Sequence, residues 1–269
     1  MNLLMGAVKG LSPRVFIPFM NSAYNFHFGD LVVFVPDDEP ETLKQFNRCD
    51  NAVTVPHPPV YDLPVNAYRY FLYREYLKEH DCENVMIADM RDVIFQSDPF
   101  SAVEHDGRLH VFHESVLFGN DMFNDGWVEK MYGANRLEIL RGCPVSCSGV
   151  TLGPRAVMLD YLEKMCEEIG RLFLAELLPR PPFFAGFDQG IHNVLVHNNP
   201  TVKHHDNGDG VLTLLKVRGG LRLHDWQAAM DGMRPAAVLH QYDRMKDKEM
   251  QFQVIFRSAA WERYARGAV

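Results

Sequence analysis

The feature that most limits the folds open to this 269-residue chain is the order of its apolar segments. Short runs rich in Val, Ile and Leu, at 3–8, 31–35, 51–55 and 85–88, alternate with longer amphipathic segments. Strands that alternate with helices in this way form parallel sheets joined by crossover helices. We therefore predict an α/β fold, a Rossmann-like, mostly parallel sheet with helices on both faces, and we expect 31–35 and 51–55 to be buried on both faces.

Later segments extend this pattern. An amphipathic helix is expected at 66–80, strands at 109–112, 149–152 and 211–217, and a loop at 178–182. Pro154 suits the first position of another helix, and a further helix opens near Asp188. We expect one domain over 1–269, with a nucleotide-binding half at 1–100 and, at 101–269, an acceptor-binding half that ends in the C-terminal metal-ligand segment.

Charge and composition exclude several classes of function. The formal net charge of −8 argues against a dedicated nucleic-acid-binding protein, which needs a basic surface. Five cysteines, an odd number, and the lack of a cleavable signal pattern favour a cytoplasmic location. No run reaches the roughly 18 to 20 apolar residues of a membrane span, so we expect no transmembrane segment and at most peripheral membrane contact.

Two carboxylates follow the expected strand at 85–88. Asp89 and Asp92 would stand at the carboxyl end of that strand, where open α/β sheets bind their ligands. A hard divalent cation held by carboxylates neutralises a diphosphate leaving group well. The pair alone is weak support, because two acidic residues three apart also occur in solvated turns.

Several segments, taken in sequence order, resemble one family. Segments 66–70 and 85–95 are similar to the arginine-bearing helix and acidic motif of A-type-fold (GT-A) nucleotide-sugar glycosyltransferases. Segments 148–152, 187–193 and 237–244 are similar to the family's small-Gly-Val strand, Asp-Gln helix and terminal histidine strand. The resemblance is closest to the glycogenin and bacterial lipopolysaccharide galactosyltransferase group. It implies a metal-dependent hexosyltransferase of polysaccharide biosynthesis that moves a sugar from a nucleotide-diphosphate-sugar donor to a glycan or lipid-linked glycan acceptor.

The resemblance also implies roles for individual residues. Mn²⁺ or Mg²⁺ would be held by Asp89, Asp92 and His240. The donor-binding residues would be Gly6, Ala7, Arg69, Asp89 and Lys246, and the catalytic residues Asp188 and Gln189. Two departures stand out: two residues separate the aspartates where the family has one, and Cys147 stands where the family often has Asn.

Simpler interpretations stay open for these residues. Asp188 also suits an N-cap, Arg69 a structural salt bridge, and His240 a satisfied structural histidine. The relatives are retaining enzymes, which implies that Gln189 of this chain lies under the anomeric carbon of the donor sugar. Inversion would instead need a carboxylate base such as Glu114.

Other residues are less informative. His204 and His205 lack partners at zinc-ligand spacing and favour turn chemistry over a zinc site. Cys143 and Cys147 are expected as small core residues. The aromatic residues Phe123, Trp127 and Tyr132 suit either an acceptor platform or the core.

Two alternative functions remain. A sugar nucleotidyltransferase normally opens with a Gly-rich loop and a basic signature, of which 6–10 is a poor version. A non-catalytic glycan-binding scaffold would keep the fold and lose metal binding.

Overall fold

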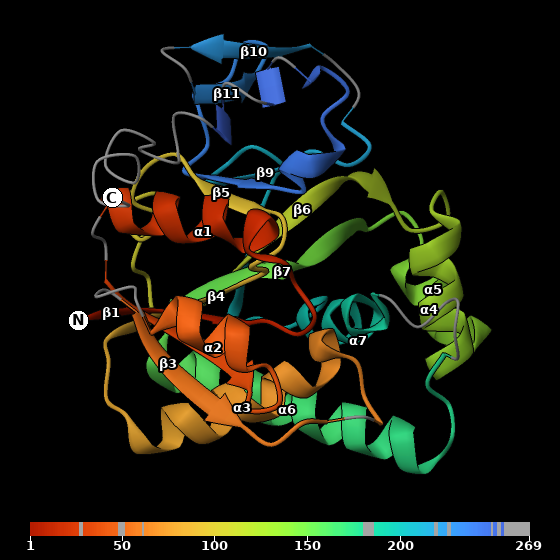
Figure 1. The fold of residues 1–269 in the computed structure, drawn as a ribbon. Coiled ribbons are helices and arrows are strands. Elements are labelled where there is room, and N and C mark those ends of the chain that lie inside the picture. Colours follow the sequence, from red (N-terminus) through yellow and green to blue (C-terminus); the bar gives the residue numbers. More distant parts are fainter. Residues whose placement is uncertain are drawn as a thin grey trace, which may run out of the picture.

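The computed structural model describes residues 1–26, 29–47, 52–60, 62–179, 186–217, 220–224, 227–248, 250–251 and 254–255. A seven-stranded sheet in the order β3-β2-β1-β4-β7-β6-β8 forms its centre (Figure 1). Its strands are β1 (Asn2–Ala7), β2 (Asp30–Pro36), β3 (Ala52–His57), β4 (Asn84–Ala88), β6 (Leu109–Leu117), β7 (Pro144–Pro154) and β8 (Val202–His205). Strands β3, β2, β1 and β4 are mutually parallel, as are β6 and β8, and β7 runs antiparallel to its two neighbours. The predicted mostly parallel sheet is confirmed.

Helices cover both faces of this sheet. They are α1 (Pro13–Phe26), α2 (Pro40–Phe46), α3 (Val65–Glu79), α4 (Met122–Tyr132), α5 (Ala134–Leu140), α6 (Arg155–Leu174) and α7 (Phe187–Val196). Because successive side chains of a strand point to opposite faces, Leu3 and Met5 join the core with α3 and α6, whereas Leu4 joins the core with α1. Figure 1 shows α1 on one side of the sheet and α3 and α6 on the other.

A smaller sheet lies beside the carboxyl end of β4. It consists of β5 (Val93–Phe95), β12 (Val238–His240) and β9 (Val211–Thr213), in the order β5-β12-β9. Beyond it the chain forms the hairpin of β10 (Leu221–His224) and β11 (Gln227–Met230), and the 3₁₀ turn η1 (Tyr242–Arg244) follows β12. This sheet connects the C-terminal segment to residues 89–92 between β4 and β5, which we call the acidic loop.

Several expected details were wrong. Segment 51–55 was expected to be buried on both faces, but β3 is the edge strand and Val53 is 53% exposed. The strand expected at 211–217 ends at Thr213. Pro154 is the N-cap of α6 and the last residue of β7, not the first residue of the helix. The expected loop at 178–182 lies partly outside the described residues.

The two adjacent histidines were also misread. Segment 202–205 is strand β8, and not a turn, because it pairs with β6. His205 lies 2.9 Å from His110, ring nitrogen to ring nitrogen, and His204 lies 3.0 Å from His113. The side chains thus meet in pairs across two neighbouring strands.

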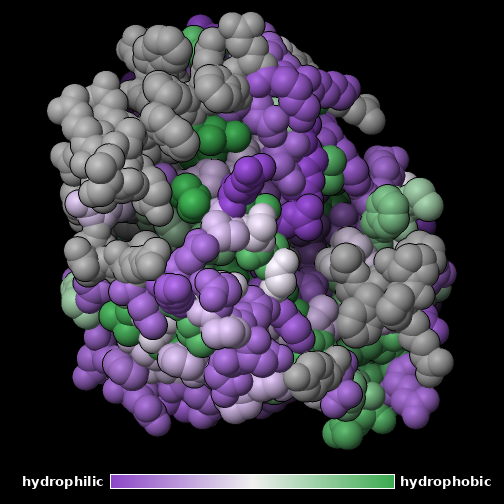
Figure 2. All heavy atoms as spheres, viewed as in Figure 1, coloured by the Kyte–Doolittle hydropathy of each residue, from purple (hydrophilic) through white to green (hydrophobic). Residues whose placement is uncertain are grey.

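The surface is largely hydrophilic on the face drawn in Figure 2, where hydrophobic atoms form small separate groups. Exposed apolar side chains include Met122, 76% exposed, and Leu174, 83% exposed, on different helices. Among the described residues, none of the helices combines the length and the apolar character needed to cross a bilayer.

Candidate active site

Pairing between strands brings Asp89, Asp92 and His240, which are far apart in the sequence, close together in space. His240 on β12 pairs with Val93 on β5, the residue that follows Asp92. On the other side, the Asp89 amide donates to the Gly149 carbonyl at 2.8 Å, which continues the β4–β7 ladder. Asp89, Asp92 and His240 are therefore positioned by backbone hydrogen bonds from three strands rather than by a flexible loop.

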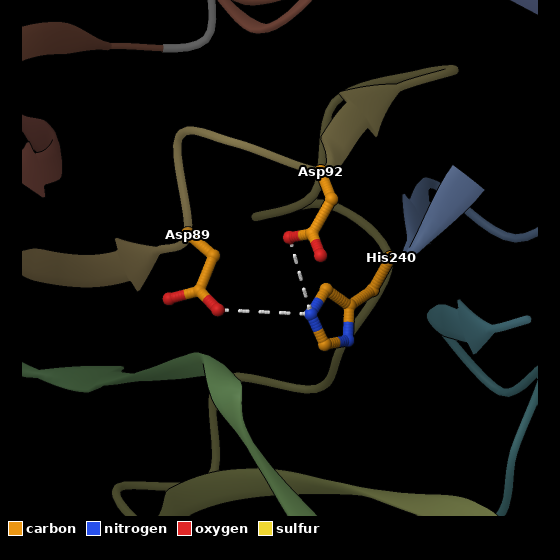
Figure 3. A group of neighbouring side chains, drawn as sticks. All are labelled: Asp89, Asp92 and His240. Atoms are coloured by element: carbon orange, nitrogen blue, oxygen red, sulfur yellow. Dashed lines mark ion pairs between the residues drawn. The ribbon is translucent and has the colours of Figure 1, made fainter. Parts of the chain in front are cut away.

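These three side chains converge (Figure 3). Nε2 of His240 lies 3.8 Å from Asp89 Oδ2 and 3.6 Å from Asp92 Oδ1. Each residue offers one ligand atom, and the three atoms lie within 4.8 Å of one another. Asp92 and His240 are buried and Asp89 is partly exposed, so the cluster opens to solvent on the Asp89 side.

Burial and charge act on this cluster in opposite directions. Burial opposes ionisation of Asp89, but the Arg69 guanidinium and His240 outweigh it and hold the pKa of Asp89 below its usual range. Burial raises the pKa of Asp92. Burial also disfavours the imidazolium of His240, yet Cys147 and Asp92 raise the pKa of His240 well above its usual value.

The second nitrogen of the imidazole is fixed by Cys147. Nδ1 of His240 lies 3.0 Å from Sγ of Cys147 and 3.4 Å from the Thr213 hydroxyl. A partner on one ring nitrogen sets the orientation of the other, so Nε2 faces the two aspartates. Cys147 is a buried residue, as expected, and it has this additional contact, which sequence reasoning missed.

Gly149 leaves space in front of the three side chains. A Cβ at this position would lie 2.6 Å from Nε2 of His240 and 2.8 Å from Oδ2 of Asp89. Real Cβ atoms do not approach polar atoms so closely, so any other residue would displace one of the two side chains. The glycine expected from the small-Gly-Val motif thus has a steric reason.

A second network joins α3 to α7. Arg69 forms an ion pair with Asp89 and donates to Asp188 at 3.1 Å. Asp188, 2% exposed, also accepts hydrogen bonds from Asn66 Nδ2 at 2.5 Å, Tyr70 OH at 3.1 Å and Ser148 Oγ at 3.1 Å. The N-cap of α7 is Gly186, so the N-cap interpretation of Asp188 is wrong.

Gln189 lies in a neighbouring polar pocket. Its Nε2 donates to Glu114 and to Asn124, each at 3.0 Å, and its Oε1 accepts from the Ser148 amide at 3.4 Å. Burial raises the pKa of Glu114. The amide of Gln189 is held at both ends, which fixes its orientation.

Not every predicted residue joins this group. Lys246 is exposed, and in this C-terminal segment it is Arg244 that reaches the cluster, with its Nη1 2.5 Å from Asp92 Oδ2. Arg244 lies within segment 237–244, the last one that resembles the family, and its positive charge was the feature of the sequence that could have indicated a contact with the aspartates. Gly6, the residue before the last of β1, lies beside the acidic loop, and a Cβ there would overlap Met90. Ala7 is partly buried.

No protein-family model and no curated protein matches the chain. Solved structures do match. An active-site mutant of the galactosyltransferase LgtC, with glutamine replaced by glutamate, shares 14% identity over 94% of this chain and 95% of that chain, with a TM-score of 0.55. LgtC in complex with donor and acceptor sugar analogues shares 15% identity over 97% and 95%, with a TM-score of 0.53. The chain therefore has the GT-A fold of LgtC, as the motif order implied.

Proposed function

We propose that this protein is a metal-dependent glycosyltransferase that moves a hexosyl group, with retention, from a nucleotide-diphosphate-sugar donor to a glycan or lipid-linked glycan. The observation that carries the proposal is the convergence of Asp89, Asp92 and His240 at the carboxyl edge of a GT-A sheet. Ligand sites of open α/β sheets lie at this edge. LgtC is a galactosyltransferase whose structure is known in complex with donor and acceptor sugar analogues, and this likeness supports the same class of reaction.

The three side chains suit a divalent cation. Within the described residues, Oδ1 of Asp92 is buried and has no hydrogen-bond partner, although it faces the other two ligand atoms. A buried carboxylate oxygen without a partner is costly unless a cation or a proton occupies it. Two carboxylates and one imidazole suit Mn²⁺ or Mg²⁺, and either cation would take its remaining ligands from water or from the diphosphate. Gly149 keeps the space between them open.

The bound cation would supply positive charge to the diphosphate as the bond to the sugar breaks. The protein's own residues orient the donor. Arg69, buried and fixed by Asp89 and Asp188, presents a rigid guanidinium to the donor, with no side-chain ordering left to complete. Asp188, positioned by four donors, is suited to bind a sugar hydroxyl.

Gln189 would lie beneath the anomeric carbon. Its amide cannot rotate freely because Glu114, Asn124 and Ser148 hold it, so it can stabilise positive charge that develops on the sugar ring. The description of a glutamine as an active-site residue of LgtC supports this assignment. Glu114 would keep the Gln189 amide oriented in a retaining enzyme.

Ligand binding to the native state tests the proposal. We expect a nucleoside diphosphate or its sugar, in the presence of Mn²⁺, to raise the melting temperature by about 5 to 10 °C at a hundredfold excess over the dissociation constant. Asp92→Asn should abolish the metal-dependent part of this shift, because it removes the anionic ligand and keeps the size of the side chain.

A matched control is Asp160→Asn, which alters an exposed carboxylate on α6, paired only at the surface with Lys164. This variant should keep the full shift. If no nucleotide stabilises the wild-type protein with or without Mn²⁺, the transferase proposal is wrong, and stabilisation by glycans alone would indicate a binding scaffold.

A further inference from the structure

A basic side chain already pairs with Asp92 of the candidate metal site, through the carboxylate oxygen opposite to the one that faces His240. Arg244 Nη1 lies 2.5 Å from Oδ2 of Asp92 and also forms an ion pair with Asp243. The backbone reaches this position because Gln241, with φ of 58°, turns the chain directly after His240. The acidic loop and the C-terminal turn are therefore joined by charge as well as by strand pairing.

The two partners of this ion pair differ in their exposure to solvent. The Asp92 side chain is 7% exposed, whereas the Arg244 side chain is 34% exposed. Asp243 contacts Arg91 as well, with Arg91 Nε 4.0 Å from Asp243 Oδ2. Arg244 can therefore leave Asp92 without any change in the core, while Asp92 is fixed by its position before β5.

The charges nearby show what this arginine does. Arg69 offsets Asp89 and Asp188, whereas Asp92 is paired with Arg244 and lies 3.6 Å from His240. A divalent cation placed between Asp89 and Asp92 would stand a few ångströms from the guanidinium. At that distance two positive charges repel each other even at the effective dielectric constant of about 20 found in proteins. The metal and Arg244 would therefore sit on the two oxygens of one carboxylate, and each would weaken the binding of the other.

We propose that Arg244 is a built-in counter-ion that weakens metal binding until a diphosphate group draws the guanidinium away, so that metal and donor bind cooperatively. This inference rests on the proposed function, because it requires a metal and a diphosphate at this site. A guanidinium binds phosphate oxygens in a bidentate manner, which gives Arg244 a new partner as it leaves Asp92. Metal without donor is then held weakly, and the complete pair is held tightly.

Titrations of Mn²⁺ into Arg244→Met test whether Arg244 weakens metal binding. The titrations are followed at pH 8 by calorimetry or by the electron paramagnetic resonance signal of free Mn²⁺. Without nucleotide, we expect Arg244→Met to bind Mn²⁺ about tenfold more tightly than the wild type does, which corresponds to about 1.4 kcal/mol. Arg244→Gln, which removes the charge and keeps hydrogen-bonding capacity, should behave alike. Lys164→Met removes an exposed cation on α6, paired with Asp160 away from the site, and should leave Mn²⁺ binding unchanged.

The binding of pyrophosphate tests whether Arg244 becomes a ligand of the diphosphate. With Mn²⁺ saturating, Arg244→Met should bind inorganic pyrophosphate at least tenfold more weakly than the wild type does. The ratio of Mn²⁺ dissociation constants without and with pyrophosphate should therefore fall in the variant. The two effects have opposite signs, and general destabilisation would weaken both.

The outcomes separate this inference from the proposed function. If the wild type binds neither Mn²⁺ nor any nucleotide, the proposed function fails and the inference fails with it. If the wild type binds both and Arg244→Met binds Mn²⁺ equally or more weakly, only the inference is overturned, and Arg244 then serves to position Asp92. Unchanged pyrophosphate binding in the variant would also overturn it.

Discussion

At the scale of single residues, the space in front of Gly149 decides whether a metal can enter. A methyl group at this position would stand 2.6 Å from Nε2 of His240 and 2.8 Å from Oδ2 of Asp89. We expect Gly149→Ala to weaken Mn²⁺ binding at least a hundredfold, because it displaces one ligand and fills the position between them. Calorimetric titration measures this loss.

A helical glycine provides the control for this variant. Gly170→Ala adds the same methyl group in α6, where nothing lies within 4 Å of the new Cβ. It should leave Mn²⁺ binding intact and stabilise the fold by about 0.5 to 1 kcal/mol, because alanine favours helix. Wild-type Mn²⁺ affinity in Gly149→Ala would show that the metal does not bind between these side chains.

At the scale of elements, a buried guanidinium connects α3 to β4 and α7. Arg69 lies between Asp89 and Asp188, and its removal would leave a buried carboxylate without a counter-charge. We expect Arg69→Met to lower the free energy of unfolding by roughly 3 to 5 kcal/mol, measured by urea denaturation without metal. Arg74→Met on the same helix removes the pair with exposed Glu75 and the contact with the Phe71 ring, and should cost about 1 kcal/mol. Equal losses in the two variants would contradict a structural role for the buried ion pairs.

At the scale of the whole molecule, neutral buried histidines make stability depend on pH. Burial lowers the pKa of His110 and of His197 to about 4, and that of His192 to about 3. Unfolded histidines protonate near pH 6.5, so between about pH 6.5 and 4 the unfolded chain binds more protons than the folded chain. This contribution to stability is complete above pH 6.5 and is lost as the pH falls towards 4.

A variant isolates this effect from the carboxylates. His197→Gln keeps a donor for the Pro144 carbonyl, which His197 Nε2 contacts at 3.0 Å, and removes the titration. Between pH 6.5 and 5, wild-type stability should fall more steeply than that of the variant, by at most about 1.4 kcal/mol per pH unit. Urea denaturation series at several pH values measure both slopes, and parallel slopes would refute the prediction.

The sequence by itself determined the elements whose signals are local. The apolar runs at 31–35 and 85–88 predicted buried parallel strands, and the amphipathic pattern predicted α3 within one residue at each end. Asp89 and Asp92 could be placed at a strand end because their position depends only on the residues just before them. Their pairing with His240 came from motif order, not from any local pattern.

Only the tertiary structure decided which residues complete the site. Asp92 and Arg244 are 152 positions apart, and Cys147 and His240 are 93 apart, so no periodicity relates them. The β5–β12 register brings Asp92 and Arg244 together, and the contact of Cys147 on β7 with His240 on β12 joins the two sheets. Both depend on packing across the whole molecule. The exposure of Val53 has the same cause: an apolar run specifies a strand, but the order of strands in the sheet decides which strand lies at the edge.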